Sequence, residues 1–554
     1  MDYLQNNYIK TKIKTFFENS KYIKLCINSI INSNLTLINS RGCFPLIFLL
    51  IHIYLRELPN GDYYKTELSK INFKRDIVPR CEHNIILLFE IYFAIKNIAN
   101  AKNKVYEIEL IDFKFQYLTK NELDIKDKLL FTTLLRHILT FDISFFGNNL
   151  KSINENLSKL QNKYLYVLDV NSLRETYQIS KKNKKNKRLK LGIVSQFINK
   201  SLKKQHVIHK WFYPLIENLP NDKYEKILIT TNISKFGFDK NCFDNVIILN
   251  NDLNLFENYN IQINELIGKS FDILLFTDIG MTTTSILLAN HRIAPKQITV
   301  GGHPITTGIK NIDLFVVKKT ACDNINYLKK SFSEQFAVLN SNISFVSKNT
   351  ILNEIKSFKT RKELDLPENM FLISCFQCSW KYSDTMYSLF NEILAIKDIR
   401  LILQLSDKHY KEIILNNIKI EYHSKIIFFE TQPHKIYLSI QYNSDIILDT
   451  FPFNGGTTSL ECFSLGKIII GLDELYNLTD NTIYLPQTCL NAYYNIMEIY
   501  GLTFKNIDQL INSIKTLSKN TKEKIRIKNL IKKNSYKLYK DSNVINEWMK
   551  ILIL

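Results

Sequence analysis

The spacing of apolar residues divides the chain into two parts. From residue 1 to about 180, apolar residues recur every three or four positions, as in HNIILLFEIYFAIKNIA (83–99) and DKLLFTTLLRHILTF (127–141), and glycines are few. This is the period of an amphipathic helix. We therefore predict an all-helical domain over 1–180, a region that also admits degenerate helical-hairpin repeats.

Beyond residue 188, short β-branched runs alternate with amphipathic segments. Two sets of such runs are present: first 190–197, 224–231, 245–250, 271–277 and 296–302, then 370–376, 399–405, 425–430, 444–450 and 467–472. Strands that alternate with helices predict parallel sheets covered by helices. We expect two Rossmann-like domains, over 189–350 and 351–554, with helices in the lysine-rich tail. Ligands of such sheets bind beyond the carboxyl ends of the strands.

Length and charge agree with this division. A chain of 554 residues is too long for one hydrophobic core and predicts three or four units. Its 73 Lys+Arg exceed its 53 Asp+Glu and give a net charge of +20. Lysine recurs in loops and predicted helices alike, which favours a compositional bias over a polyanion site. The run KKNKKNKR (181–188) is interpreted as a solvated linker, and nucleic acid is not expected as a partner.

The cysteines and the apolar segments point to the cytoplasm. The nine cysteines are scattered from Cys26 to Cys489 and indicate no disulfide framework, as in a reducing compartment. The start of the chain does not resemble a secretory signal. The most apolar stretch, 44–55, is shorter than the ~20 residues that span a bilayer, so no membrane span is expected. Cys375 and Cys378 form a lone CxxC, which is weak evidence for zinc.

The segment SDIILDTFPFNGGTTSLECFSLGKIII (444–470) contains most of the candidate binding residues. A buried strand leads into an Asn-Gly-Gly turn, and two threonines open a helix, whose N-terminus suits a phosphate. A glutamate one turn further along can accept hydrogen bonds from ribose hydroxyls. The alternative is an ordinary strand–turn–helix junction in which Thr458 is the N-cap. The candidates are Asn454, Gly455, Gly456, Thr457, Thr458 and Glu461.

Four further residues are candidates by their position. Lys381 follows a predicted strand, where its ammonium can neutralise a diphosphate, and His434 precedes the helix that leads into the 444–450 strand. His303 follows the Gly-Gly at the end of the 296–302 strand, where an imidazole can act as a general base. His206 begins the helix after the first strand. The alternative for each is a structural or exposed role, which is the commoner one for a lone histidine or lysine.

In combination these segments resemble glycosyltransferase family 41, which contains the O-GlcNAc transferases and bacterial N-glycosyltransferases. The resemblance rests on the order LGIVSQF, DIG, RIAPKQITVGGHPITTGIKNID, the lysine of CFQCSWK, and SDIILDTFPFNGGTTSLE, and it covers roughly 189–515. It implies a GT-B fold, in which two facing Rossmann-like domains follow an all-α N-terminal domain that receives a protein acceptor.

The resemblance also implies roles for single residues. Lys381 would contact the diphosphate, the segment 454–458 would bind phosphate and sugar, and Glu461 would replace the family's ribose-binding aspartate. His434 would lie near the uridine. No metal site or other cofactor is expected, since the sequence has no Asp-x-Asp pair to hold Mg²⁺ or Mn²⁺ on a diphosphate.

Departures from the family pattern leave the catalytic base open. The loop after the first strand is lengthened, so that either Lys200 or His206 can take the place of the family's histidine near the reacting sugar. Gly308 stands where the N-glycosyltransferases have a second histidine, and His303 is the other candidate base.

The expected function is metal-independent, inverting transfer of GlcNAc or glucose from a UDP-sugar to a protein side chain, a Ser/Thr hydroxyl or an Asn amide. The alternatives are an inactive binding protein of the same fold and a polyanion-binding protein that uses the basic linker.

Overall fold

The computed structural model describes the carboxyl-terminal two thirds of the chain with short gaps. The described residues are Thr132, Thr133, Arg136, Thr140, 151–165, 188–198, 206–231, 242–249, 259–300, 302–321, 325–341, 357–405, 409–473, 482–539 and 542–553. Most of the predicted helical domain over 1–180, residues 181–187 of the basic linker, and Lys200 lie outside the described residues.

The chain forms two compact units. The smaller consists of Met1–Thr140, Glu155–Val167 and Asp252–Tyr259, and the larger of Phe141–Asn154, Leu168–Asn251 and Asn260–Leu554. In the smaller unit, Gln161 in α8 (Lys151–Asn162) is buried and has two polar partners. Its carboxamide accepts a hydrogen bond from Arg136 at 2.9 Å and donates one to Thr133 at 2.7 Å. Paired polar groups of this kind can be buried at little cost.

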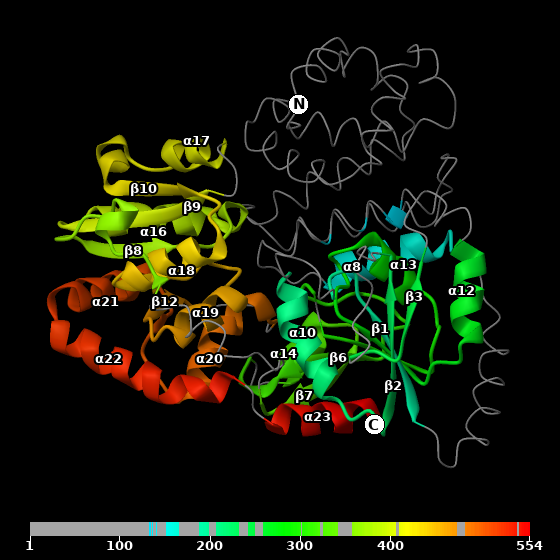
Figure 1. The fold of residues 1–554 in the computed structure, drawn as a ribbon. Helices are drawn as coiled ribbons and strands as arrows, with labels where there is room; N and C mark the ends of the chain where they lie inside the picture. Colours follow the sequence, from blue (N-terminus) through cyan, green and yellow to red (C-terminus); the bar gives the residue numbers. More distant parts are fainter. Residues whose placement is uncertain are drawn as a thin grey trace, which may run out of the picture. The chain divides into compact units, whose positions relative to one another are not determined.

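The larger unit contains two parallel sheets (Figure 1). The first has seven strands in the order β3-β2-β1-β4-β5-β6-β7. The strands are β1 (Leu189–Val194), β2 (Tyr224–Thr230), β3 (Asn245–Ile248), β4 (Ile273–Phe276), β5 (Lys296–Thr299), β6 (Leu314–Lys318) and β7 (Gln335–Leu339). The helices between them are α10 (Val207–Asn218), α12 (Tyr259–Gly268), α13 (Thr283–Ala289) and α14 (Ile325–Ser331), with the 3-10 turn η6 (Lys319–Ala321).

The centre of this sheet is buried on both faces. All four residues of β4 are buried, as are the last four of β1, which explains why their sequences are apolar runs without alternation. Gly192 in β1 allows close packing, because a Cβ there would lie 2.4 Å from a methyl group of Leu274. The two Rossmann-like sheets confirm the predicted α/β fold class.

The second sheet has six parallel strands in the order β10-β9-β8-β11-β12-β13. They are β8 (Phe371–Cys375), β9 (Ile399–Leu405), β10 (Ile426–Glu430), β11 (Ile446–Leu448), β12 (Ile469–Leu472) and β13 (Thr503–Phe504). Its helices are α16 (Asp384–Leu394), α17 (His409–Asn416), α18 (His434–Asn443), α19 (Thr457–Ser464), α20 (Cys489–Met497), α21 (Ile507–Lys519) and α22 (Thr521–Asn534). Short 3-10 turns are η8 (Lys362–Leu364), η9 (Ser379–Lys381), η10 (Ile420–Lys425), η11 (Leu485–Thr488) and η12 (Ser535–Leu538).

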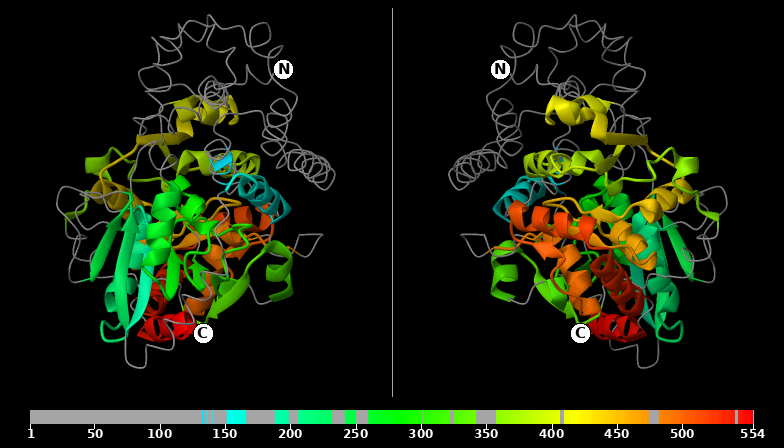
Figure 2. Two further views of the ribbon diagram at one scale, coloured as in Figure 1. Left: turned by 90° about the vertical axis from the view of Figure 1, so that its right-hand side faces the viewer. Right: turned by 90° about the vertical axis from the view of Figure 1, so that its left-hand side faces the viewer.

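The last helix returns to the first sheet. In α23 (Ser542–Ile553), Val544, Trp548 and Leu552 are buried in the core that also contains Leu191 and Leu339. Both views of Figure 2 show this helix beside the strands of the first sheet. The predicted second domain, 351–554, therefore ends in a helix whose apolar face belongs to the core of the first.

Trp548 provides a test of this packing. Its side chain is fully buried, whereas Ile553 on the same helix is 64% exposed. We expect Trp548→Ala to destabilise the protein by about 3–5 kcal/mol, the range for removing a large aromatic side chain from a core. Ile553→Ala should change stability by less than about 0.5 kcal/mol. Thermal unfolding followed by far-UV circular dichroism measures both, and equal shifts of the two midpoints would contradict the placement of α23.

Candidate functional site

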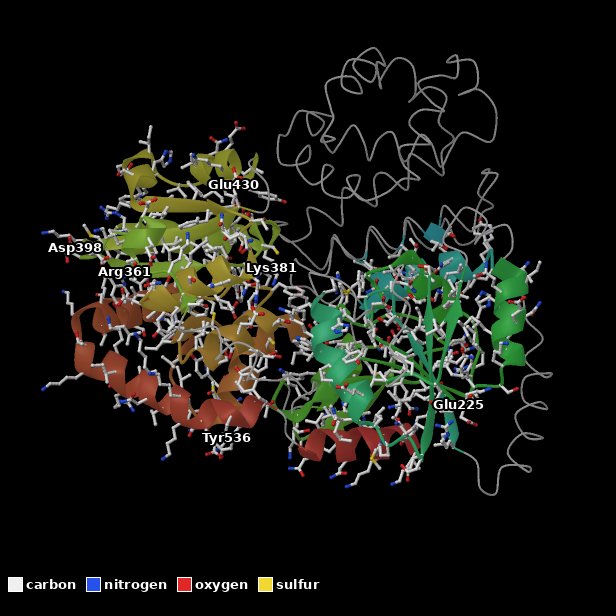
Figure 3. All side chains as sticks on the ribbon, in the orientation of Figure 1. Glu225, Arg361, Lys381, Asp398, Glu430 and Tyr536 are labelled. Atoms are coloured by element: carbon white, nitrogen blue, oxygen red, sulfur yellow. The ribbon has the colours of Figure 1, made fainter. Side chains whose placement is uncertain are left out.

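Loops that follow strands of both sheets line one cavity of about 630 Å³. A parallel sheet gathers such loops at the carboxyl ends of its strands, which is where ligands of this architecture bind. Lys381, which follows β8, and Asp398, which precedes β9, lie at opposite ends of the second sheet (Figure 3). Nine of the ten predicted site residues line the cavity: His206, His303, Lys381, His434, Asn454, Gly456, Thr457, Thr458 and Glu461.

The tenth, Gly455, shapes the turn before α19. A Cβ at Gly455 would lie 2.3 Å from Nε2 of Gln377 and 2.5 Å from Oγ1 of Thr458, so only glycine fits. Gly456 is the N-cap of α19 and makes no side-chain capping bond. The N–H groups of the first turn of α19 are therefore not capped by a side chain. The uncapped turn lies at the cavity wall, where it suits an anion.

The two threonines that open α19 are held by residues outside the helix. The indole N–H of Trp211, on α10, donates to Oγ1 of Thr457 at 2.6 Å. The amide of Gln377 donates to Oγ1 of Thr458 at 2.6 Å. The alternative interpretation of Thr458 as the N-cap is wrong, because Gly456 occupies that position. Each threonine hydroxyl still carries a proton that it can donate to a ligand.

The side chain of Asn454 stabilises the turn before α19 through two hydrogen bonds. Its buried amide donates to the carbonyl of Thr450 at 2.8 Å, and its Oδ1 accepts from the N–H of Leu490 at 3.3 Å. Its own carbonyl oxygen lies 3.4 Å from Nζ of Lys381. The side chain of Asn454 is thus occupied within the protein, and its main chain forms part of the cavity wall.

Lys381 has polar neighbours but no carboxylate partner within the described residues. Its ammonium donates to Oε1 of Gln377 at 3.0 Å and lies 4.6 Å from the ring centroid of Phe453. Burial lowers the pKa of Lys381, while neighbouring thiols and the Asp449 carboxyl oppose this effect. A charged lysine next to the uncapped start of α19 makes this part of the cavity wall positive.

Glu461 accepts hydrogen bonds from both domains. Its Oε1 lies 2.9 Å from Nζ of Lys210 on α10 and 2.9 Å from Nε2 of His434 on α18. Burial raises the pKa of this carboxyl, but the hydrogen bond from His434 and the charge of Lys210 outweigh burial, and the pKa lies below its usual value. Both contacts use Oε1, so Oε2 remains able to accept a hydrogen bond from a ligand.

His206 is the N-cap of α10. Its Nδ1 accepts a hydrogen bond from the N–H of Ile208 at 3.2 Å, and its ring stacks on Phe197 with the centroids 3.9 Å apart. Burial lowers its pKa to about 4. The ring is therefore neutral near pH 7, and because Nδ1 accepts, the proton resides on Nε2. This geometry suits a hydrogen-bond donor better than a general base.

His303 is the other predicted base, and it is only 5% exposed where it lines the cavity. The turn before it packs tightly on the first sheet, because a Cβ at Gly302 would lie 2.6 Å from Cα of Asp278. Asp278 in turn accepts from the N–H of Gln196 at 2.8 Å and from the hydroxyl of Ser285. Gly308 has φ of 66°, a left-handed conformation in which a histidine would be strained.

Several residues of the family-like motifs have structural roles. The amide of Gln297, in APKQ, bonds four backbone groups: it accepts from Ile293 and Ala294 and donates to the carbonyls of His291 and Asn311. Thr306 and Thr307, in HPITTG, both donate their hydroxyl protons to the buried Glu334. Gln297, Thr306 and Thr307 therefore hold the loops of the first domain, whereas His303 of the same segment lines the cavity.

The cavity is also lined by residues that were not predicted from the sequence. Lys210 and Trp211 lie one turn after His206 on α10, and that helical spacing was the available signal. Gln377 stands between the cysteines of CFQC, and nothing in its context marks it. Cys375 and Cys378 form no disulfide; the first is buried and the second half-buried.

The described part of the chain lacks two kinds of feature. No group of three His, Cys, Asp or Glu side chains there has the geometry to hold a metal ion. Among the same residues, no helix has both the length and the apolar character that crossing a bilayer requires.

Asp449, under the 454–456 turn, provides a pH-dependent test. Its Oδ1 accepts from the N–H groups of Thr450 and Gly455, while Oδ2 has no partner within the described residues. Burial raises its pKa from 3.8 to about 6. The folded protein therefore holds this proton between pH ~4 and ~6 and the unfolded chain releases it, so the contribution of Asp449 to stability falls as the pH rises through this window.

We expect the stability of the wild type relative to Asp449→Asn to fall by up to about 3 kcal/mol from pH ~4 to ~6, at ~1.4 kcal/mol per pKa unit. Asp445→Asn is the control, because Arg361 and Lys524 pair with Asp445 and its pKa is lowered. The stability contribution of Asp445 is lost only below its ordinary pKa, so its difference curve should stay flat in this window. Urea unfolding at several pH values measures both, and matching curves would contradict the assignment.

Comparison with known proteins supports the fold. No family model matches the chain, and neither does any curated protein. Its structure is similar to a mutant of the O-GlcNAc transferase of Thermobaculum terrenum, with a TM-score of 0.52 and 14% identity over 85% of this chain and 97% of that chain. A weaker likeness is to a glycosyltransferase from Rickettsia africae, with a TM-score of 0.44 and 15% identity over 66% of this chain and 98% of that chain. Another is to Anabaena HepE in complex with UDP and glucose, with a TM-score of 0.46 and 11% identity over 66% of this chain and 100% of that chain. At such identities the likeness is one of fold, and the two sheets of this chain form a GT-B fold.

Proposed function

We propose that this protein is a glycosyltransferase that uses a UDP-sugar. It transfers GlcNAc or glucose, with inversion and without a metal ion, to a protein side chain: a Ser/Thr hydroxyl or an Asn amide. The observation that carries the proposal is Lys381, which lies beside the uncapped N-terminus of α19 in a cavity at the carboxyl ends of two parallel sheets.

The diphosphate is assigned to this positive wall. The Lys381 ammonium and the first-turn N–H groups of α19 supply fixed positive charge where the leaving group becomes more negative. The hydroxyl protons of Thr457 and Thr458 provide two further donors, since both oxygens are held in place by Trp211 and Gln377. This arrangement neutralises a diphosphate with protein groups alone, which supports a metal-independent reaction.

The nucleoside is assigned to the neighbouring turn of α19. Oε2 of Glu461 accepts hydrogen bonds from the ribose hydroxyls, while Oε1 keeps its hydrogen bonds from Lys210 and His434. The ring of His434 is nearly parallel to that of Tyr437, at 13°, and its side chain is 46% exposed, so its outer face is open to a base.

Transfer then requires an acceptor on the side of the first domain. The acceptor oxygen or nitrogen attacks the anomeric carbon, the bond from that carbon to the diphosphate oxygen breaks, and UDP leaves with the electron pair. We assign proton removal from the acceptor to His303. His206 donates from Nε2 to a substrate oxygen, because its Nδ1 is occupied as the N-cap.

A protein acceptor and a cytoplasmic location remain part of the proposal. Both rest on the family resemblance and on the cysteine pattern of the sequence, and the region assigned to acceptor binding, 1–180, lies mostly outside the described residues. The polyanion alternative rests on the basic linker, of which only Arg188 is described; it forms an ion pair with Asp244 at 2.8 Å.

A second candidate function is nucleotide binding without turnover. The observation in its favour is His206, whose accepting nitrogen is already bonded and whose pKa of about 4 makes it a poor base at neutral pH.

Titration calorimetry with UDP and a chelator tests the proposed binding site. We expect the wild type to bind UDP without metal and Lys381→Ala to lose about 1.5–3 kcal/mol, the range for a hydrogen bond to a charged group. Lys533→Ala removes an equal charge from an exposed position of α22 and should bind as the wild type does. Absence of saturable UDP binding by the wild type would refute the proposal, as would equal weakening by the two variants.

Release of UDP from UDP-GlcNAc and UDP-glucose separates the two candidate functions. If the protein is a transferase, we expect slow hydrolysis above background, lowered about 10²-fold or more by His303→Asn with UDP affinity retained, since a general base contributes at least this factor. His423→Asn is the control, because the His423 ring bonds carbonyls of Leu415 and Ile418 outside the cavity. Binding of UDP without any hydrolysis would favour the binding protein.

A further inference from the structure

Lys318 is a buried lysine at the end of a strand that lines the cavity. It is the last residue of β6, at the carboxyl end of the first sheet, and it is 6% exposed. Burying an ammonium group is costly unless its hydrogens find partners. The hydrogen-bond partners of Lys318 therefore show whether its buried ammonium has a structural role.

Those partners are weak within the described part of the chain. Nζ of Lys318 lies 3.9 Å from Sγ of Cys489 and 4.0 Å from the ring centroid of Tyr493. A thiol is a weak acceptor, and a ring face accepts no conventional hydrogen bond. Three ammonium hydrogens thus have no carbonyl or carboxylate acceptor among the described residues.

Other buried lysines of this chain do have such acceptors. Lys226, 1% exposed, donates to the carbonyls of Ile216 and Leu219 at 3.0 and 3.1 Å. Lys467, 5% exposed, donates to the carbonyls of Tyr442 and Ser444. Both lysines are structural by this criterion. Lys318 differs from them in two respects: it lacks these bonds, and it faces a cavity.

Lys318 lies next to a second helix N-terminus. Helix α20 begins at Cys489, directly after η11, and its N-cap, Thr488, makes no side-chain capping bond. One N–H group of its first turn, that of Leu490, donates to Oδ1 of Asn454 at 3.3 Å, and no side chain among the described residues is seen to cap the others. The hydroxyl of Thr488 instead donates to the carbonyl of Leu485 at 3.0 Å. The partial positive charge of α20 therefore adds to that of Lys318.

Among the residues that the structure describes, three lysines line the cavity, and two of them are already accounted for. Lys210 is paired with Glu461, and Lys381 is assigned to the diphosphate. Lys318 remains. We propose that Lys318, with the start of α20, binds a second negative charge of the substrates: a carboxylate carried either by the donor sugar, as in a hexuronate, or by the acceptor. This inference rests on the proposed function, because it assigns the diphosphate to Lys381.

The first experiment compares UDP-glucuronate with UDP-glucose, which differ only in a carboxylate in place of a hydroxymethyl group. If the donor sugar carries the carboxylate, the wild type should bind UDP-glucuronate about ten-fold or more tightly than UDP-glucose, because a hydrogen bond between charged groups contributes at least this much. Lys318→Met should abolish this preference and leave the affinity for UDP-glucose within about two-fold. Lys318→Gln is the second variant, and the thermal midpoint of each reports whether it folds.

The second experiment probes the subsite with a free carboxylate. Iodoacetate and iodoacetamide both alkylate Cys489 by the same step: the thiolate attacks the methylene carbon, a C–S bond forms, and iodide leaves. Peptide mass spectrometry measures the alkylation rate of Cys489 by each reagent in UDP-saturated protein. If the Lys318 ammonium attracts the carboxylate of iodoacetate, the ratio of the iodoacetate rate to the iodoacetamide rate should fall about five-fold or more in Lys318→Met. The half-buried Cys378 provides the internal reference.

The outcomes separate the sources of the carboxylate. Effects of Lys318→Met in both experiments support a donor-borne carboxylate, and an effect on alkylation alone supports an acceptor-borne one. Normal UDP binding with neither effect overturns the inference and leaves the proposed function intact. If UDP does not bind at all, the proposed function fails, and alkylation of the UDP-free protein still decides whether Lys318 attracts a carboxylate.

Discussion

The buried carboxylate of Glu461 is the contact on which the geometry of the cavity depends. It draws together a cation on α10, from the first sheet, and a histidine on α18, from the second. A buried carboxylate without such partners would be strongly disfavoured, so the three groups hold one another in place. With Lys210 fixed against α19, the next residue of α10, Trp211, reaches the hydroxyl of Thr457. A ligand that uses the remaining oxygen of Glu461 would add to this arrangement without breaking it.

The sheets could be predicted where strands are buried on both faces. β4, β8 and the last four residues of β1 are nearly continuous apolar runs, and such runs are visible in a single sequence. Three strands were missed: β6, β7 and β13. β7 lies at an edge and alternates between exposed and buried positions, β13 has only two residues, and β6 ends in a lysine whose burial depends on the surrounding fold. The sequence patterns of these three strands are too short to recognise, or their burial is determined by contacts with distant parts of the chain.

The candidate site could be predicted in part for a related reason. Residues that follow strands reach the cavity because parallel strands align their carboxyl ends, so position along the chain was enough to find Lys381, His303 and the segment 454–458. Contacts between distant residues could not be found in this way. Trp211 and Thr457 are 246 positions apart, and no local pattern pairs them. The role of His206 as an N-cap depends on the direction of its ring, which sequence does not specify.

The return of α23 to the first sheet makes the second domain an insertion within the first. The chain leaves the first core after β7, builds the whole second sheet and its helices, and comes back to bury Trp548 beside Leu191. The second domain is thus tethered at both of its ends, so a single cut in either connection leaves the two domains covalently joined. Completion of the first core must also wait until α23 has been synthesised, after the whole of the second domain.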